Sequence, residues 1–339
     1  MRTVKVSKCV KEGNTSNENE NQHRYSVRNI LIQFPYSKFS RKIHMADTSA
    51  TLDNELQKFH SICVRLDHQI HFTSWMKDAG KRTIEKYSEY IEARGGNKDD
   101  IGTGTALAVI NVFSTNDFPV RSPIGAELSR GERVNQLTEE INLRLNGILL
   151  CSLHEAWENY VKKALSIMLF AFKNNLIMRD LPRFKNFHDK KRKKYHKTFL
   201  YFEEYADFIC RQNCNDAYEL FKNQLEFPCV IKQKYHFFDV AWFEICKALA
   251  LLRNSIIHAD GRINIERLKR LDSQMVNIIK TNMIHKSEIT NDDRLLVPDA
   301  FAGYFVEAMA THAYTIYVLL TKKASLPRKF DYFIYQKLK

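Results

Sequence analysis

One short segment of the sequence combines side chains that could carry out acid–base chemistry. Residues 253–258 contain Arg253, Asn254 and His258, with a serine and two isoleucines between them. Histidine accepts and donates protons near neutral pH, whereas the guanidinium of arginine stays ionised and offers planar donors that match a phosphate group. These residue types together could move a proton and stabilise the charge that develops on a phosphate during its cleavage.

The same residues also have a purely structural interpretation. Arg253 could pair with a carboxylate, and Asn254 could help to close a helix. His258 could be a helix-terminal histidine that the helix dipole favours. The sequence leaves this alternative open beside the catalytic one.

A helix over residues 238–259 is expected to position the segment. Its apolar residues recur at three- and four-residue steps, which predicts a core stripe formed by Ile245, Leu249, Leu252 and Ile256. At roughly 100° per residue, Asn254 and His258 lie together on the far side, bracketed by Leu251 and Ile257. A helix with a second, mixed face usually buries that face as well, against another helix or a second copy of the chain. Asp260 and Gly261 then predict the end of the helix.

This segment resembles the Arg-x4-6-His signature of the HEPN superfamily. In that family a polar residue, often Asn, follows the arginine, as Asn254 follows Arg253 here, and the histidine comes near the end of an apolar helix. The resemblance is sharp over this segment and extends over the last two thirds of the chain only as a pattern of helices. It implies an all-α fold, a HEPN-like helical bundle with an additional N-terminal helical region.

The resemblance further implies a metal-independent endoribonuclease with no cofactor. Two copies of the motif would face each other across a homodimer and share one site for RNA, with Arg253, Asn254 and His258 as its catalytic residues. Such enzymes act in toxin–antitoxin systems or antiviral defence, so an antitoxin or defence-system partner is a further expectation. Some toxins of the family carry a modifiable Tyr two residues after the histidine, where this chain has Asp260, so that mode of control is not expected.

Other classes of function stay open. One alternative is a catalytically inactive HEPN-like protein that binds nucleic acid or acts as a scaffold, and another is a helical adaptor with no nucleic-acid role. Family members often have an acidic or polar residue on an earlier helix near the site, which makes Glu155 and Glu158 candidate auxiliary residues. Either glutamate could equally be solvent-facing or part of a salt bridge.

Positive charge is concentrated in one segment, residues 183–197. The formal net charge of the chain is +13, and this segment holds eight basic residues and one acid. A dense basic patch attracts polyanions, so the nucleic-acid-binding residues are expected to be Lys190, Lys191, Arg192, Lys193, Lys194 and Lys197. The interleaved Phe184, Phe187 and Tyr195 could stack on bases or could anchor the segment to the body of the protein.

Cysteine usage and hydropathy indicate a cytoplasmic protein. The seven cysteines are odd in number, scattered, and never spaced as Cys-x2-Cys, which argues against a disulfide framework and a zinc module. No metal site of another kind is expected. The sequence has no apolar run of the length that a membrane-spanning helix needs and no secretory signal, so no membrane partner is expected.

Three regions are expected along the chain. Residues 1–45 predict a disordered leader, with Met45 as an alternative start. Residues 46–122 predict an N-terminal helical region, and a Pro-containing break at 118–123 separates it from a HEPN-like helical domain over 123–339 with a basic loop at 183–197. Periodicity predicts further helices at 52–94, 127–176, 196–226, 264–285 and 298–323. The first is expected to be capped by Thr51 or Asp53 and to have an apolar stripe formed by Leu52, Leu56, Phe59, Cys63, Leu66 and Ile70. The second is expected to have one apolar face, formed by Leu137, Ile141, Leu145, Ile148 and Leu149 and continued by Trp157, Tyr160, Val161, Leu165 and Met168.

Overall fold

The computed structural model is predominantly helical, as the sequence predicts. It describes residues 45–98, 102–105, 108–109, 120–121, 127–177, 180–191, 198–212, 214–225, 234–287 and 290–326. The predicted leader and its junction with Met45 therefore lie outside the described residues, apart from Met45 itself.

The first helix, α1 (Met45–Glu92), contains the apolar stripe that the sequence predicts. Its members are all at most 5% exposed: Leu52, Leu56, Phe59, Cys63, Leu66 and Ile70. The helix begins before both expected caps, Thr51 and Asp53. It ends at Glu92, and the chain then turns through Gly95, which has a positive φ of 76°.

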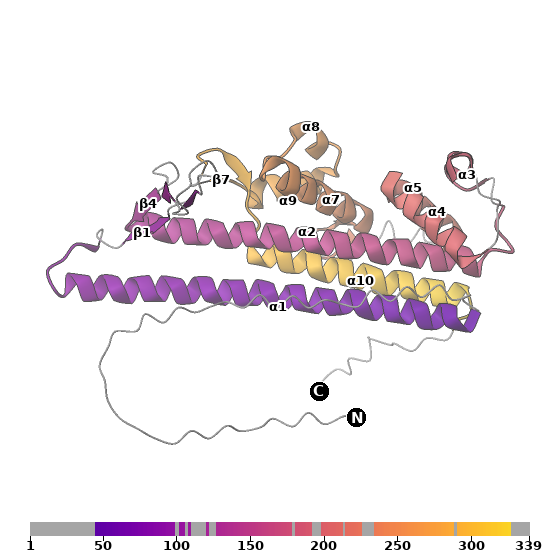
Figure 1. Ribbon diagram of the computed structural model, residues 1–339, viewed down its shortest axis with the longest axis horizontal. Coiled ribbons are helices and arrows are strands. Elements are labelled where there is room, and N and C mark those ends of the chain that lie inside the picture. The colour runs from indigo at the N-terminus through magenta and orange to yellow at the C-terminus, as the bar shows by residue number, and fades with distance from the viewer. Residues whose placement is uncertain are drawn as a thin grey trace, which may run out of the picture. The chain divides into compact units, whose positions relative to one another are not determined.

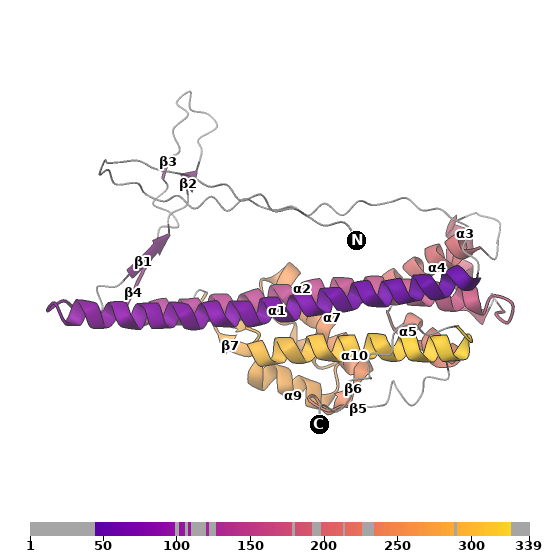
Figure 2. The same ribbon diagram turned by 90° about the horizontal axis from the view of Figure 1, so that it is seen from below.

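Two further long helices, α2 (Glu132–Ala171) and α10 (Asp299–Lys323), lie alongside α1 (Figures 1 and 2). The hydroxyl of Tyr317 donates to Asp53 of α1 at 2.6 Å, and the hydroxyl of Tyr160 donates to the carbonyl of Ala313 at 2.7 Å. Lys77, near the other end of α1, pairs with Asp299. These contacts make α1 antiparallel to both partners, and the core lies between the three helices.

The expected apolar face of α2 is only half correct. The predicted residues in the second half of the helix are buried, but Ile141, Leu145 and Ile148 are 52%, 41% and 53% exposed. At about 100° per residue these three lie on the side of α2 opposite the core. The buried positions in this half of the helix include three polar residues, Glu140, Asn142 and Asn146.

Asn142 and Asn146 each donate a hydrogen bond to Asp299, at 2.9 and 2.6 Å. Asn146 also donates to the carbonyl of Val297. Burial acts to raise the pKa of Asp299, but bonds from Asn146, Ser74 and Asn142 and the charge of Lys77 outweigh it and lower that pKa. This polar cluster ties the start of α10 to α1 and α2.

The helix of the 253–258 motif, α7 (Trp242–Ala259), packs on α2. The chain enters it through a hairpin, β5 (Lys234–Tyr235) and β6 (Val240–Ala241), so the helix starts later than residue 238. The two helices cross where a Cβ on Gly147 would lie 3.0 Å from Cδ1 of Ile256. The absence of a side chain at Gly147 therefore permits this close approach.

The segment after α7 forms two short helices where the sequence predicts one. The single helix expected at 264–285 is two, α8 (Ile265–Leu268) and α9 (Ser273–Asn282), because Asn264 and Asp272 each accept a backbone hydrogen bond and cap a separate helix. A hairpin follows, with β7 (Ile284–Lys286) antiparallel to β8 (Asp293–Leu295).

The region between α2 and α7 contains α3 (Phe184–Lys191), α4 (Phe199–Gln212) and α5 (Cys214–Leu225). The helix expected at 196–226 is thus divided in two, and α4 packs on α2. Before α2, strand β1 (Gly102–Thr105) pairs with β4 (Glu127–Arg130), and β2 (Ala108–Val109) pairs with β3 (Val120–Arg121). Strand β4 occupies the positions where α2 was expected to begin.

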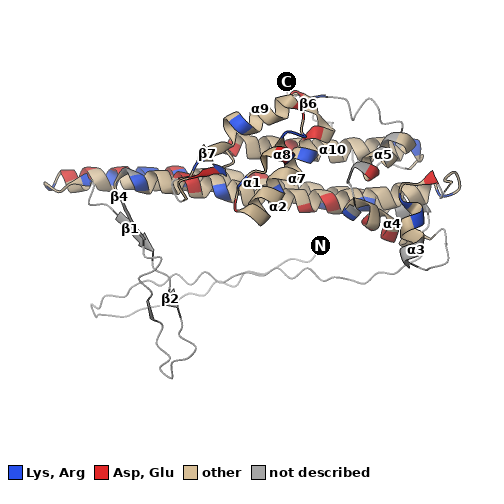
Figure 3. Cartoon of the chain, turned by 90° about the horizontal axis from the view of Figure 1, so that it is seen from above, with Lys and Arg blue, Asp and Glu red and all other residues tan. Residues whose placement is uncertain are grey.

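The part of α1 after Lys77 extends past the start of α10, and acidic and basic side chains alternate along it (Figure 3). Nearer the other end of α1, buried residues belong to the same core as those of α2, α7 and α10. The segments before and after the expected boundary at 118–123 therefore share one core. Most residues of the boundary itself lie outside the described part of the chain. Among the helices that the structure describes, none has the length and apolar content needed to cross a bilayer.

Candidate functional site

The three motif side chains meet at the C-terminal end of α7. Nη1 of Arg253 donates a hydrogen bond to Oδ1 of Asn254 at 3.0 Å and lies 3.2 Å from Nε2 of His258. Because a guanidinium donates and cannot accept, Nε2 of His258 is the acceptor in this contact. The geometry places a permanent cation against a ring nitrogen that can take up a proton.

Solvent can reach this group of side chains. His258 is exposed, and Arg253 and Asn254 are half-buried. Within the described part of the chain no carboxylate forms an ion pair with Arg253, so the predicted structural alternative of an Arg–acid pair is not realised there. The guanidinium keeps donors that can bind an anion.

Helix α2 forms the other side of the site. Burial raises the pKa of Cys151 to about 11, and the charge of Arg253 acts against that rise. Burial also lowers the pKa of His154, a shift that Glu158 opposes and Arg253 reinforces. Helix α7 packs on α2 here, and Asn254 lines one pocket with His154 and Glu158 of α2.

Comparison of the chain with family models, curated proteins and solved structures gave no match. The assignment of function therefore depends on the site itself.

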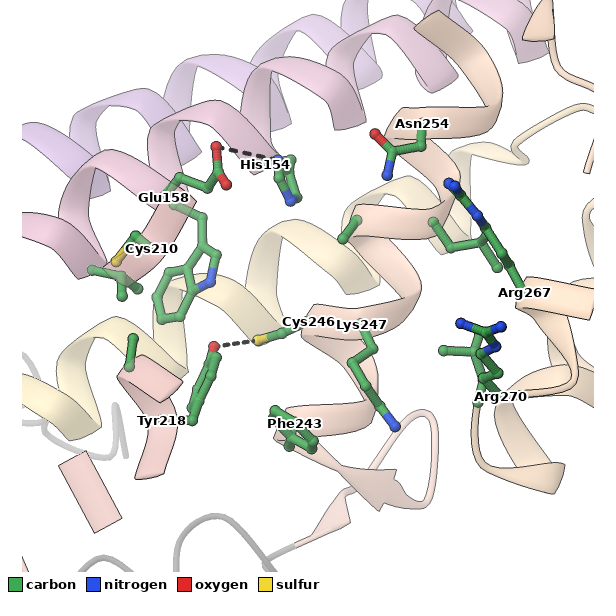
Figure 4. A pocket seen from close by; sticks show the side chains of 16 residues that line it. His154, Glu158, Cys210, Tyr218, Phe243, Cys246, Lys247, Asn254, Arg267 and Arg270 are labelled. Atoms are coloured by element: carbon green, nitrogen blue, oxygen red, sulfur yellow. Dashed lines mark hydrogen bonds and ion pairs between the residues drawn. The ribbon is translucent and has the colours of Figure 1, made fainter. Parts of the chain in front are cut away.

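The two candidate auxiliary glutamates of α2 have different surroundings. Glu155 is exposed. Glu158 is half-buried, lies 4.0 Å from Nδ1 of His154, and lines a pocket to which Asn254 also contributes (Figure 4). The structure thus brings Glu158, but not Glu155, into one cavity with a motif residue.

The basic segment 183–197 was expected to be a loop, but residues 184–191 of it form helix α3, and residues 192–197 lie outside the described part of the chain. Lys190 and Lys191 are the last residues of α3, but their side chains are not described. The other expected nucleic-acid-binding residues and one aromatic residue lie wholly outside the described part: Arg192, Lys193, Lys194, Lys197 and Tyr195. Phe187 is fully buried and packs edge-on against Tyr201 and Tyr205. Of the two alternatives for Phe187, anchoring to the body is therefore the one realised.

The end of α7 is held by a group of side chains that no sequence pattern indicates. Asp260 adopts the left-handed conformation, with φ 49°, and Gly261 donates to the carbonyl of Ser255, which confirms the predicted helix stop. Arg294, only 3% exposed, donates to the carbonyl of Asp260 at 2.6 Å and pairs with its carboxylate at 3.2 Å. Arg144 of α2 reaches the same carboxylate.

Arg294 and Arg144 fix the turn that follows His258. Arg144 also pairs with Glu140 and donates to Ser287, so the network connects α2, α7 and the loop after β7. No sequence spacing relates residues 144, 260 and 294, which explains why the motif alone did not reveal them.

We predict that Arg294→Met will lower the free energy of unfolding by about 2–3 kcal/mol, because the hydrogen bonds that its buried guanidinium donates to the carbonyls of Ala259 and Asp260 are lost. Chemical denaturation measures this change. Arg262→Met is the matched control: Arg262 pairs with Asp292, as Arg294 does, but its side chain is 68% exposed. We expect it to cost at most about 1 kcal/mol. Equal losses for the two variants would contradict the anchoring role of Arg294.

Proposed function

We propose that the chain is a HEPN-like endoribonuclease that cleaves RNA without a metal ion, through a composite site at a homodimer interface. The observation that carries the proposal is the contact between Arg253 and His258 at 3.2 Å, on the solvent-exposed end of an otherwise buried helix. A role in toxin–antitoxin systems or antiviral defence, with a cognate partner protein, belongs to the same proposal and follows from the family resemblance.

In this mechanism, His258 of one protomer takes the proton from a ribose 2′-hydroxyl. The 2′-oxygen attacks phosphorus, and the bond from phosphorus to the 5′-oxygen breaks. His258 of the second copy, protonated beforehand, donates a proton to the leaving 5′-oxygen. The products are a 2′,3′-cyclic phosphate and a 5′-hydroxyl. Arg253 stabilises the charge on the phosphate oxygens, because its donors are fixed before the reaction begins.

An exposed apolar strip supports the dimer. It comprises Ile141, Leu145 and Ile148 on α2, together with Ile257 on α7, which is 53% exposed. Ile148 directly follows Gly147, the residue at which α2 meets Ile256, so the strip runs beside the end of α7 that carries His258. Burial of apolar side chains at this position would bring two copies of the motif together.

We predict that Ile148→Lys will convert the dimer to a monomer and abolish cleavage, because burying a lysine charge twice at a twofold interface is unfavourable. Light scattering at micromolar concentration measures the mass. Val64→Lys is the matched control, since Val64 on α1 is also exposed, at 54%, and is not part of the strip. A wild-type protein that is strictly monomeric under these conditions would contradict the shared site.

The nuclease assay itself uses end-labelled RNA in EDTA, with the wild type beside an Arg253→Ala/His258→Ala variant. We expect cleavage by the wild type alone, products that end in a cyclic phosphate, and no cleavage of RNA that lacks 2′-hydroxyls. If neither protein cleaves any of a range of RNAs while both bind them equally, the alternative of a catalytically inactive nucleic-acid-binding or scaffold protein replaces the proposal.

A further inference from the structure

A pocket of about 250 Å³ lies beside the motif, between α2, α5, α7 and the segment around α8 (Figure 4). Asn254 belongs to its lining, and the other motif residues do not. Its volume is below the roughly 300–1,000 Å³ of sites that enclose a drug-sized ligand. The pocket therefore suits one ring system of a ligand whose remainder stays outside.

The walls of the pocket are planar and firmly held. Trp157 of α2 and Tyr218 of α5 line it, and both stack on the buried ring of His312, at centroid distances of 4.9 and 5.9 Å. Phe243 of α7 completes the aromatic lining and packs edge-on against Tyr218 at 5.2 Å. Aromatic walls of this kind favour a flat aromatic ligand, because its faces can stack on them.

Cations lie at one side of the pocket. Figure 4 shows Lys247, Arg267 and Arg270 together, across the cavity from Glu158 and His154. Lys247 is paired with Glu244 at 2.6 Å. Arg267 and Arg270 are exposed, and no carboxylate in the described part of the chain forms an ion pair with either. Two guanidinium groups without a carboxylate partner there can bind a phosphate by paired hydrogen bonds.

The opposite side of the pocket offers an acceptor. Glu158 is half-buried, so its carboxylate can accept hydrogen bonds from the edge of an inserted ring system. Among the nucleobases, guanine presents two adjacent N–H donors on one edge, which match the two oxygens of a carboxylate.

We propose that this pocket binds one guanine nucleotide. The base lies between the aromatic walls with its N–H edge toward Glu158, and its phosphate contacts Arg267 and Arg270. The nucleotide would be part of the RNA chain that reaches His258, a placement that rests on the proposed ribonuclease function. The pocket would then choose which phosphate of the RNA lies against the catalytic residues.

Isothermal titration of the full-length protein with nucleoside monophosphates tests the proposal. We expect GMP to bind at least 10-fold more tightly than UMP or ribose 5-phosphate. Arg267→Ala/Arg270→Ala is expected to weaken GMP binding at least 10-fold. Lys269→Ala is the matched control: Lys269 lies on the same segment, pairs with Glu266 and does not line the pocket, so binding should stay within 2-fold of wild type.

Glu158→Gln supplies a second variant, because it keeps the size of the side chain. It is expected to remove the preference for GMP over UMP. If inorganic phosphate binds as tightly as GMP, or if GMP binding survives the double arginine substitution, the proposal is overturned. Cleavage of RNA without GMP binding would refute the pocket alone, whereas GMP binding without cleavage would refute the ribonuclease function alone.

Discussion

Replacing His258 with alanine is expected to lower the rate of RNA cleavage by about 10²–10⁴-fold, the usual contribution of a positioned general acid or base. In a symmetric dimer the substitution removes both proton-transfer groups at once. His258 is exposed, so its loss should leave the free energy of unfolding within about 0.5 kcal/mol of wild type. Single-turnover cleavage of labelled RNA measures the rate, and thermal unfolding checks the fold.

The control for this experiment is His285→Ala. His285 is also an exposed histidine, and its Nε2 lies 3.0 Å from the carbonyl of Asn282 and not against a motif side chain. We expect this variant to cleave at the wild-type rate. Cleavage by His258→Ala at an undiminished rate would assign the activity to another part of the chain.

A substitution at Arg253 can separate the contribution of its positive charge from that of its planar hydrogen-bond donors. Arg253→Lys keeps a cation but loses the planar donors, so the contact with Asn254 and His258 cannot be reproduced in full. We expect its rate to lie between those of the wild type and Arg253→Ala. Equal rates for the two Arg253 variants would show that the fork of donors matters and that the charge by itself does not.

The motif helix could be predicted from the sequence because its signal is local. Apolar residues at helical spacing predict a stripe, and Ile245, Leu249 and Leu252 are indeed fully buried. The stop at Asp260 depends on the conformation of adjacent residues, which sequence also indicates. Leu251 illustrates the limit: it was expected to bracket the polar face, but it is only 7% exposed and belongs to the hydrophobic core, at the edge of the pocket.

Contacts between segments far apart in the sequence could not be predicted. The first half of α2 has apolar residues at helical spacing, and this pattern predicts a core face that contains Ile141 and Leu145. The structure instead buries Asn142 and Asn146, because Asp299 and the carbonyl of Val297 satisfy their amides. The pocket likewise unites Trp157, Tyr218 and Arg267 from three separate segments. Only the tertiary fold makes such partners available.

Acid is expected to destabilise the protein through His312 of α10, because burial in the protein core keeps this histidine in its neutral form. Burial lowers the pKa of His312 from 6.5 to about 3, and its ring stacks on Trp157 and Trp242 at 4.9 and 5.3 Å. Because the pKa is lower in the folded state than in the unfolded state, the unfolded chain binds the proton first. The stability from this group is therefore complete above pH 6.5 and is lost as the pH falls toward 3.

The free energy of unfolding should fall by about 1.6 kcal/mol between pH 6.5 and pH 5 from this residue alone, as the slope rises toward its limit of roughly 1.4 kcal/mol per pH unit. His60 and His154, whose pKa values burial also lowers, act in the same direction. Urea denaturation at pH 5, 6 and 7 measures the slope.

His312→Phe is the control, because it keeps a planar ring beside Trp157 and Trp242 and removes the titrating group. Its free energy of unfolding should depend less on pH than that of the wild type, whatever its absolute value. If wild type and His312→Phe lose the same free energy over this range, His312 does not carry the proton uptake. Acid sensitivity would then have to originate in His60 and His154, and the stack around His312 would serve packing alone.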